Sequence, residues 1–143
     1  MTTSDPSASS SICRIDPQTL HPTPGSHHMT VVRSGRTAYL AGQCPLDPSR
    51  KLVGEGDLDQ QIDQVAANAM TASAAVDAAP DQTVRSMIHV VSDETEMLAA
   101  AWRRLTTSPL GPAFTTASTP LGVAQLGFHG RLVELDLTVE LPA

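Results

Sequence analysis

The feature that most constrains the fold is an unbroken alternation of apolar and polar side chains in the segment LVELDLTVEL, residues 132–141. Side chains at every second position of a β-strand point to the same face of the sheet. One face of this segment is therefore apolar and the other is acidic or hydroxylated, which predicts a sheet with one covered and one polar face. The apolar face consists of Val133, Leu135, Leu137, Val139 and Leu141, and the polar face of Glu134, Asp136, Thr138 and Glu140.

Two helical segments have the periodicity needed to cover the apolar face. After Asp57, a favourable N-cap residue, apolar side chains recur every three or four residues as far as Pro80, which predicts a helix of about 22 residues. A second helix is expected to follow Asp93 and to end at Pro109 and Gly111.

Four further segments read as strands, at residues 29–32, 37–43, 84–91 and 115–126. The first two are expected to pair as a hairpin through the turn at 34–35. The resulting order of elements, ββαβαββ, predicts an α+β fold in which a mixed sheet carries both helices on one face.

Composition places the chain among small folded domains. Residues 1–25 are rich in Ser, Thr and Pro and are expected to be a flexible N-terminal segment, with the folded domain over residues 26–143. Nine Lys and Arg against 15 Asp and Glu give a net charge of −6, which disfavours nucleic acid and anionic membranes as partners.

The two cysteines form neither a disulfide framework nor a CxxC pair, and the first residues lack the features of a secretory signal. We therefore expect a cytoplasmic protein with reduced thiols. No apolar run has the length of a membrane span, and the histidines lack metal-ligand spacing, so neither a metal nor another cofactor is expected.

Three stretches, TAYLAGQCPLDPSRKLVGEGD, TASTPLGVAQL and GRLVELDLTVEL, together resemble the Rid family of reactive-intermediate deaminases, also called YjgF or RidA. The resemblance extends over about residues 28–141. It implies a chorismate-mutase-like (YjgF-like) fold and a homotrimer whose sheets form a central β-barrel. It also implies small-molecule clefts at the subunit interfaces, in which active members hydrolyse enamines and imines derived from amino acids.

Several positions depart from the pattern of the family. The arginine that holds the substrate carboxylate is replaced by Ser118, within a stretch from Leu105 to Gly130 that contains no Asp, Glu, Lys or Arg. His28 stands where an aromatic hydroxyl residue is usual, and Ala101 where an amide is often found. The resemblance therefore implies that this chain is not an imino-acid deaminase.

Other positions match the family. Glu134 keeps the acid of the last strand, and Gly42 with Gln43 keeps the end of an earlier strand. Cys44 stands where an aliphatic residue is usual and is expected at the mouth of the cleft.

A hairpin turn at Gly127 and Gly130 would make Ser118 and Glu134 direct neighbours on paired strands. We expect Glu134 and His28 to be the catalytic proton-transfer groups. Substrate-binding contacts are expected from Ser118, Gly42, Gln43 and Cys44. The alternative for each is structural: polar groups of an interface, a surface histidine or an inert buried thiol.

These residues predict a divergent enzyme that acts on an unstable or specialised metabolic intermediate. Two alternatives stay open: a non-catalytic trimer that binds a metabolite or a partner, and an enamine or imine deaminase with an altered substrate. A cluster of His28, Ser118 and Glu134 around one pocket would favour an enzyme.

Overall fold

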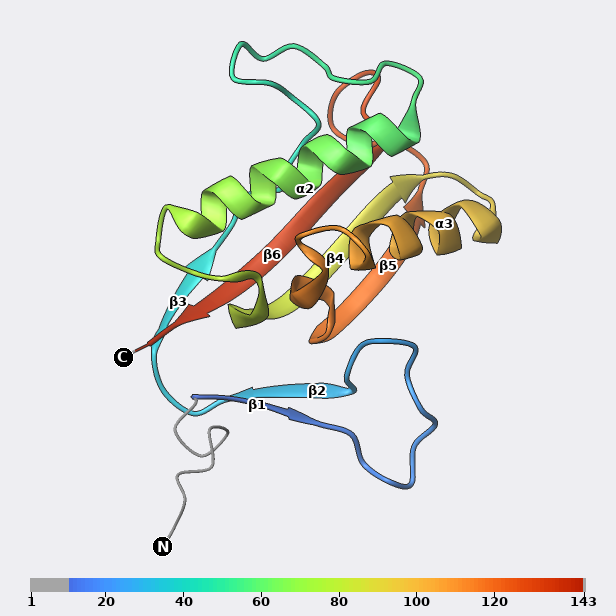
Figure 1. The fold of residues 1–143 in the computed structure, drawn as a ribbon. Helices are drawn as coiled ribbons and strands as arrows, with labels where there is room; N and C mark the ends of the chain where they lie inside the picture. Colours follow the sequence, from blue (N-terminus) through green and yellow to red (C-terminus); the bar gives the residue numbers. More distant parts are fainter. Residues whose placement is uncertain (1–10, 143) are drawn as a thin grey trace, which may run out of the picture.

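The structure is a computed structural model that describes residues 11–142. This part of the chain contains two α-helices, two 3₁₀ helices and six strands (Figure 1). In chain order they are β1 (Ile12–Ile15), β2 (Met29–Val32), β3 (Arg36–Tyr39), α2 (Leu58–Ala74), η1 (Pro80–Gln82), β4 (Thr83–Val91), α3 (Thr95–Thr106), η2 (Gly111–Phe114), β5 (Ala117–Val123) and β6 (Val133–Leu141).

Four strands form the main sheet, in the order β3-β6-β4-β5. Strand β6 is antiparallel to both β3 and β4, whereas β4 and β5 are parallel and are connected through α3. The sheet is therefore mixed, as the alternation of strands and helices predicted.

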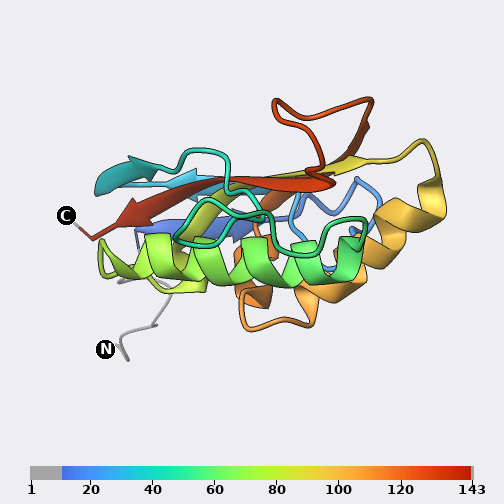
Figure 2. The same ribbon diagram turned by 90° about the horizontal axis from the view of Figure 1, so that it is seen from above.

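Both helices lie on one side of this sheet (Figure 2), which confirms the predicted α+β architecture. Val133, Leu135 and Leu137 of β6 are fully buried against them, in one core with side chains of α2, α3 and β4. Burial of each such side chain stabilises the fold by about 1.5 to 3 kcal/mol. The open face carries the polar side of β6.

The predicted helix cap is confirmed, because the Asp57 side chain accepts a hydrogen bond from the backbone N–H of Gln60 at 3.1 Å. Helix α2 is shorter than expected at 17 residues, since the chain turns through Asp77 with φ of 57°. Helix α3 begins after Glu94, one residue beyond the predicted cap. In the described part of the chain, neither helix combines the length and apolarity needed to cross a bilayer.

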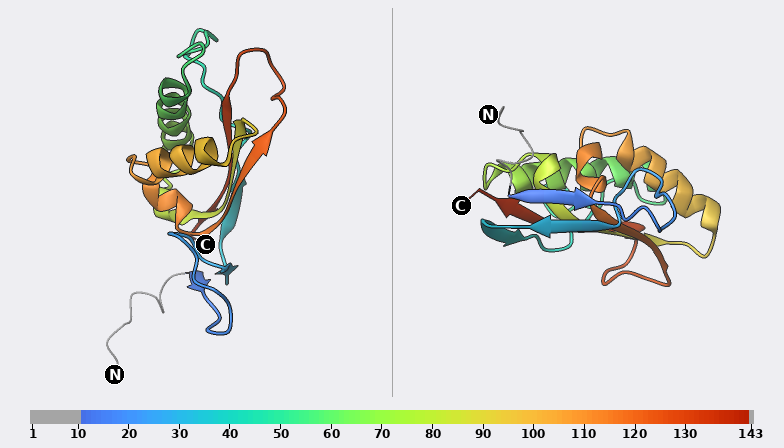
Figure 3. Two further views of the ribbon diagram at one scale, coloured as in Figure 1. Left: turned by 90° about the vertical axis from the view of Figure 1, so that its right-hand side faces the viewer. Right: turned by 90° about the horizontal axis from the view of Figure 1, so that it is seen from below.

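The hairpin predicted between residues 29–32 and 37–43, which correspond to β2 and β3, is wrong. Strand β2 pairs with β1 in a separate two-stranded sheet beyond the end of the main sheet (Figures 1 and 3), and β3 pairs with β6. Between them, Gly35 has φ of +136° and passes so close to β6 that an added Cβ would lie 2.3 Å from the carbonyl oxygen of Leu141. The chain therefore changes sheet at this turn.

The segment expected to be a flexible lead-in contains β1. Arg14 of this strand donates hydrogen bonds to the carbonyl oxygens of Asp81 and Thr83 at 2.7 and 3.0 Å, which connects β1 to the start of β4. Within residues 1–25, Ile12–Ile15 is therefore a strand, residues 1–10 lie outside the described part, and the flexibility of the segment stays a prediction.

The predicted hairpin between β5 and β6 is also wrong, because β4 lies between them. Pro120 explains the edge position of β5: it has no N–H to donate to a strand ladder and so suits a strand with one neighbour. Ile88 and Val90 of β4 are fully buried, as expected for a central strand. Residues 124–132 therefore carry the chain past β4 to its other side.

Two loops at one end of the sheet, residues 44–56 and 124–132, are joined by the buried side chain of Gln61 on α2. Its Nε2 donates to the carbonyl oxygens of Gly54 and Gly130, both at 3.0 Å, and its Oε1 accepts from the N–H of Leu132 at 2.7 Å. We call this arrangement the Gln61 bridge. It satisfies the carbonyl of Gly130 and the N–H of Leu132, and it adds a second hydrogen bond to the carbonyl of Gly54, which also accepts the N–H of Asp57 at 2.9 Å.

We predict that Gln61→Leu lowers the free energy of unfolding by about 2 kcal/mol or more, because the carbonyl of Gly130 and the N–H of Leu132 lose their hydrogen-bond partner. Urea denaturation measures the change. Gln60→Leu is the matched control, since Gln60 is exposed and uses its backbone in the helix cap. Equal losses in the two variants would contradict the role given to the bridge.

Candidate functional site

The structure divides the six predicted site residues into two groups. Gly42, Gln43 and Cys44 lie beside Glu134 at one end of the main sheet, whereas His28 and Ser118 lie near the start of β5. The second location follows from the hydrogen bond between the N–H of Ala117 and Oγ1 of Thr30, two residues after His28.

Backbone pairing places the first group. The chain continues beyond β3 alongside β6, where Gln43 and Leu135 exchange N–H···O bonds at 2.7 and 3.1 Å. Glycine is needed at position 42, since an added Cβ would lie 1.9 Å from Oε1 of Glu134. The carboxylate of Glu134 thus occupies the space that a side chain at position 42 would take.

Cys44 lies between two opposite charges, and we call Cys44, Arg131 and Glu134 the Cys44 cluster. Arg131 Nη1 donates to Cys44 Sγ at 3.0 Å. Burial raises the pKa of the Cys44 thiol, and the charge of Glu134 and a hydrogen bond to it raise this pKa further, against the opposing effect of Arg131. The thiol therefore stays protonated near neutral pH, which does not favour a nucleophilic thiolate.

Arg131 and Phe128 are site residues that the sequence reasoning missed. The Arg131 guanidinium lies 4.1 Å from the centroid of the Phe128 ring, a cation–π contact. One sequence feature could have indicated them: Phe128 and Arg131 lie on either side of Gly130, a few residues before Glu134.

His89, rather than His28, is the histidine beside Glu134 in the described chain. The two residues are direct partners on β4 and β6, and Leu121 of β5 follows on the far side of His89. Direct partners on antiparallel strands have Cβ atoms about 4.5 to 5.5 Å apart on the same face. The open face therefore brings an imidazole and a carboxylate together.

Ser118 lies on the other face of the sheet. It pairs with Ser86, which pairs with the buried Leu137, so its side chain is on the side of the helices. Its hydroxyl is hydrogen-bonded to Ser86 Oγ and lies 3.1 Å from the carbonyl oxygen of Phe114. The hydroxyl is thus occupied within its own protomer.

Ser118 and Glu134 are consequently not cross-strand neighbours, and that prediction is wrong. The register places Glu134 three residues along β6 from Leu137, the residue level with Ser118. This separation is about 10 Å along the strand, in addition to two strand spacings.

His28 is held in a small polar group at the end of the β1–β2 sheet. Its N–H donates to Asp16 Oδ1 at 2.8 Å, and its Nε2 lies 2.7 Å from the carbonyl oxygen of His21. The His28 N–H and the ring of His27, which lies 2.6 Å from Asp16 Oδ2, lower the pKa of Asp16. Because Ser118 and Glu134 project from opposite faces of the sheet, the described part of one protomer does not bring these two side chains together.

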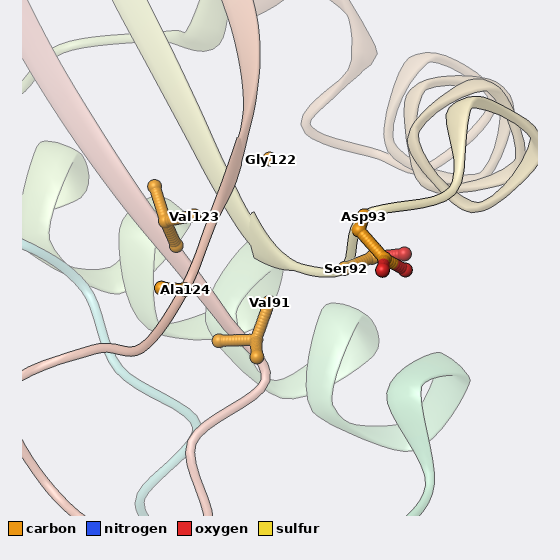
Figure 4. Close-up of a pocket in the computed structure, with 6 residues that line it drawn as sticks. All are labelled: Val91, Ser92, Asp93, Gly122, Val123 and Ala124. Carbon is orange, nitrogen blue, oxygen red and sulfur yellow. The ribbon is translucent and has the colours of Figure 1, made fainter.

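A shallow groove follows the ends of the parallel strands β4 and β5 (Figure 4). The side chains of Val91 and Val123 lie on one side of this view, and that of Asp93 points away from both. With one titratable side chain on its wall, this groove offers less chemistry than the Cys44 cluster. Within residues 11–142, no three His, Cys, Asp or Glu side chains are arranged to hold a metal ion.

Comparison with known proteins agrees with this fold. The sequence model of the family described as Endoribonuclease L-PSP matches residues 19–141. The crystal structure of YyfB from Yersinia pestis, described as a protein of unknown function of the conserved Rid family, is 30% identical with a TM-score of 0.82, and the match covers 92% of this chain and 99% of that one.

Two yeast structures share the fold at lower identity. They are YEO7 (20% identical, TM-score 0.64, 91% of this chain and 98% of that one) and Mmf1 (18%, 0.60, 91% and 98%). No curated protein matches the sequence. The chain belongs to the Rid family, also called YjgF or endoribonuclease L-PSP.

The charges around Cys44 predict its alkylation behaviour. In a Cys13→Ser background, the rate of reaction with iodoacetamide should rise with pH to a midpoint above about 8.5, the value of a free thiol. Glu134→Gln should lower this midpoint by removing a negative charge, and Arg131→Gln should raise it. Because burial is the largest cause of the raised pKa, the midpoint in Glu134→Gln should still exceed the free value.

Glu94→Gln, a remote exposed charge change, is the control for this measurement. Midpoints that do not respond to either Glu134 or Arg131 would contradict the geometry of the cluster.

Proposed function

We propose that the protein is a homotrimer with small-molecule clefts between its subunits, and that it acts as a divergent enzyme on an unstable or specialised metabolic intermediate. Glu134 and His28 serve as proton-transfer groups, and Gly42, Gln43 and Cys44 bind the substrate together with Ser118, whose hydroxyl keeps acceptor capacity beside its bonds to Ser86 and Phe114. The observation that carries this proposal is the division of the site residues between two distant ends of one protomer. In the assembly, the group at Glu134 of one subunit and the group at His28 and Ser118 of a neighbouring subunit contact the same ligand.

The open face of the sheet supports association through this surface. Both helices cover the opposite face (Figure 2), and Tyr39 on β3 is 81% exposed. Tyr39 pairs with Thr138, so it shares the open face with Asp136 and Glu134. A large exposed aromatic residue on a sheet face without a covering layer is typical of an interaction surface.

Ser118 argues against imino-acid hydrolysis as the reaction. A guanidinium binds a carboxylate through two charge-assisted hydrogen bonds, whereas the Ser118 hydroxyl is neutral, short and already bonded to Ser86. Each lost hydrogen bond to a charged group weakens binding by about 1.5 to 3 kcal/mol, which is at least tenfold. The part of the ligand near Ser118 is therefore neutral or cationic.

Assembly is tested by light scattering and native mass spectrometry at micromolar concentration. We expect the mass of three chains, and a small molecule retained by the wild-type trimer but lost in Glu134→Gln. A monomer would contradict the proposal. A trimer that retains its ligand without ever converting it would favour the non-catalytic alternative.

The reaction is tested by generating 2-iminopropionate in solution and trapping it with semicarbazide while the protein competes. We expect no appreciable acceleration of imine hydrolysis by the wild type, and no full activity in Ser118→Arg, because His28 also departs from the family pattern. Strong competition by the wild type would contradict this proposal and favour an enamine or imine deaminase with an altered substrate.

A further inference from the structure

A pocket of about 540 Å³ lies between the two loops joined by the Gln61 bridge. Its wall consists of Leu46, Arg50, Leu52, Phe128, His129 and Arg131. The two loops are closely packed, since a Cβ on Gly130 would lie 2.9 Å from Cδ2 of Leu52. The pocket is therefore built from both loops and depends on their fixed position.

The wall of this pocket is basic in an acidic protein. The chain has nine Lys and Arg against 15 Asp and Glu, yet Arg50, His129 and Arg131 line this space together. Among the described lining residues there is no carboxylate. Two guanidinium groups that line one space create a positive potential that attracts an anion. Glu134, which lies near Arg131 in the Cys44 cluster, is not among the residues that line the pocket.

Both guanidinium groups are available to a ligand. Within residues 11–142 neither Arg50 nor Arg131 forms a salt bridge. Arg131 contacts the weak acceptor Cys44 Sγ and the Phe128 ring, which leaves most of its five N–H donors free. Asp47 is the acid closest to Arg50 in sequence, and its Oδ1 accepts hydrogen bonds from the backbone N–H groups of Ser49 and Lys51 at 2.8 and 3.0 Å. This carboxylate is therefore used within its own loop.

The remaining wall is apolar. Phe128 is 66% exposed although Arg131 lies against its ring, so much of the ring is free for another contact. Leu46 and Leu52 lie on the opposite loop. An aromatic side chain beside free guanidinium groups suits a ligand with a flat apolar body and one anionic group.

We propose that this pocket binds a small organic anion, a carboxylate or phosphate ester carried on a flat apolar body. Arg50 and Arg131 hold the anionic group, and Phe128 packs against the body. The site lies within one protomer and requires neither catalysis nor a trimer, so it goes beyond the function proposed above.

Isothermal titration calorimetry at physiological salt tests this with four probes: benzoate, phenyl phosphate, benzyl alcohol and benzylamine. We expect benzoate and phenyl phosphate to bind at least about tenfold more tightly than benzyl alcohol and benzylamine. Binding of one anion and not the other would identify the group that the site accepts and would support the proposal.

Variants locate the binding. Arg131→Gln and Arg50→Gln should each weaken benzoate binding at least about tenfold. The matched control Arg33→Gln, an exposed arginine between β2 and β3, should leave it unchanged. Phe128→Leu should weaken the binding of benzoate by removing the aromatic contact. Because Arg50 lies on an exposed loop, its variant tests the site even if Arg131→Gln disturbs the fold.

Three results would overturn the proposal: no heat of binding at about 10 mM benzoate, equal affinity for benzyl alcohol, or an equal loss in Arg33→Gln. Light scattering on the same samples separates this proposal from the previous one. A monomer that binds benzoate through Arg50 and Arg131 would contradict the trimer and leave the anion site supported.

Discussion

The two loops that form the anion pocket and carry Arg131 are joined by the hydrogen bonds of one buried amide. Gln61 is fully buried on α2 and bonds to backbone groups of two loops that are separated by about half of the chain. Fixing these loops also fixes Arg131, which follows Gly130 directly and reaches Cys44 on the other side. The position of Arg131 at this end of the sheet therefore depends in part on Gln61, although the two side chains share no hydrogen bond in the described part of the chain.

The same structure separates the predicted site residues within one protomer. Glu134, Gly42 and Cys44 are brought together by pairing at the start of β6, whereas Ser118 and His28 lie around the start of β5. The serine that replaces the family's arginine is bonded into its own sheet. The cation near Glu134 is instead Arg131, which reaches the cluster from a loop.

Local sequence patterns were sufficient to predict most helices and strands, but they did not predict which distant segments pair. The alternation in β6 and the cap at Asp57 follow from side-chain period and a single hydrogen bond. Strand order depends on which distant segments meet, so β5 was placed beside β6 although Pro120 indicated an edge. Gln61 lies three residues after Leu58 and four before Val65, so the helical period places it on the apolar face, but its backbone partners come from distant loops that the period does not indicate. Arg131 was missed because its partners, Cys44 and Phe128, come from different loops.

The central claim is that the site is completed by a second protomer. A crystal structure of the assembled protein tests it most directly, by the distances between His28 or Ser118 of one protomer and Glu134 of its neighbour. The account predicts that these residues face one another across a single cleft at each subunit interface. An assembly in which every Glu134 faces solvent, or faces another Glu134 with His28 and Ser118 remote from it, would contradict the account.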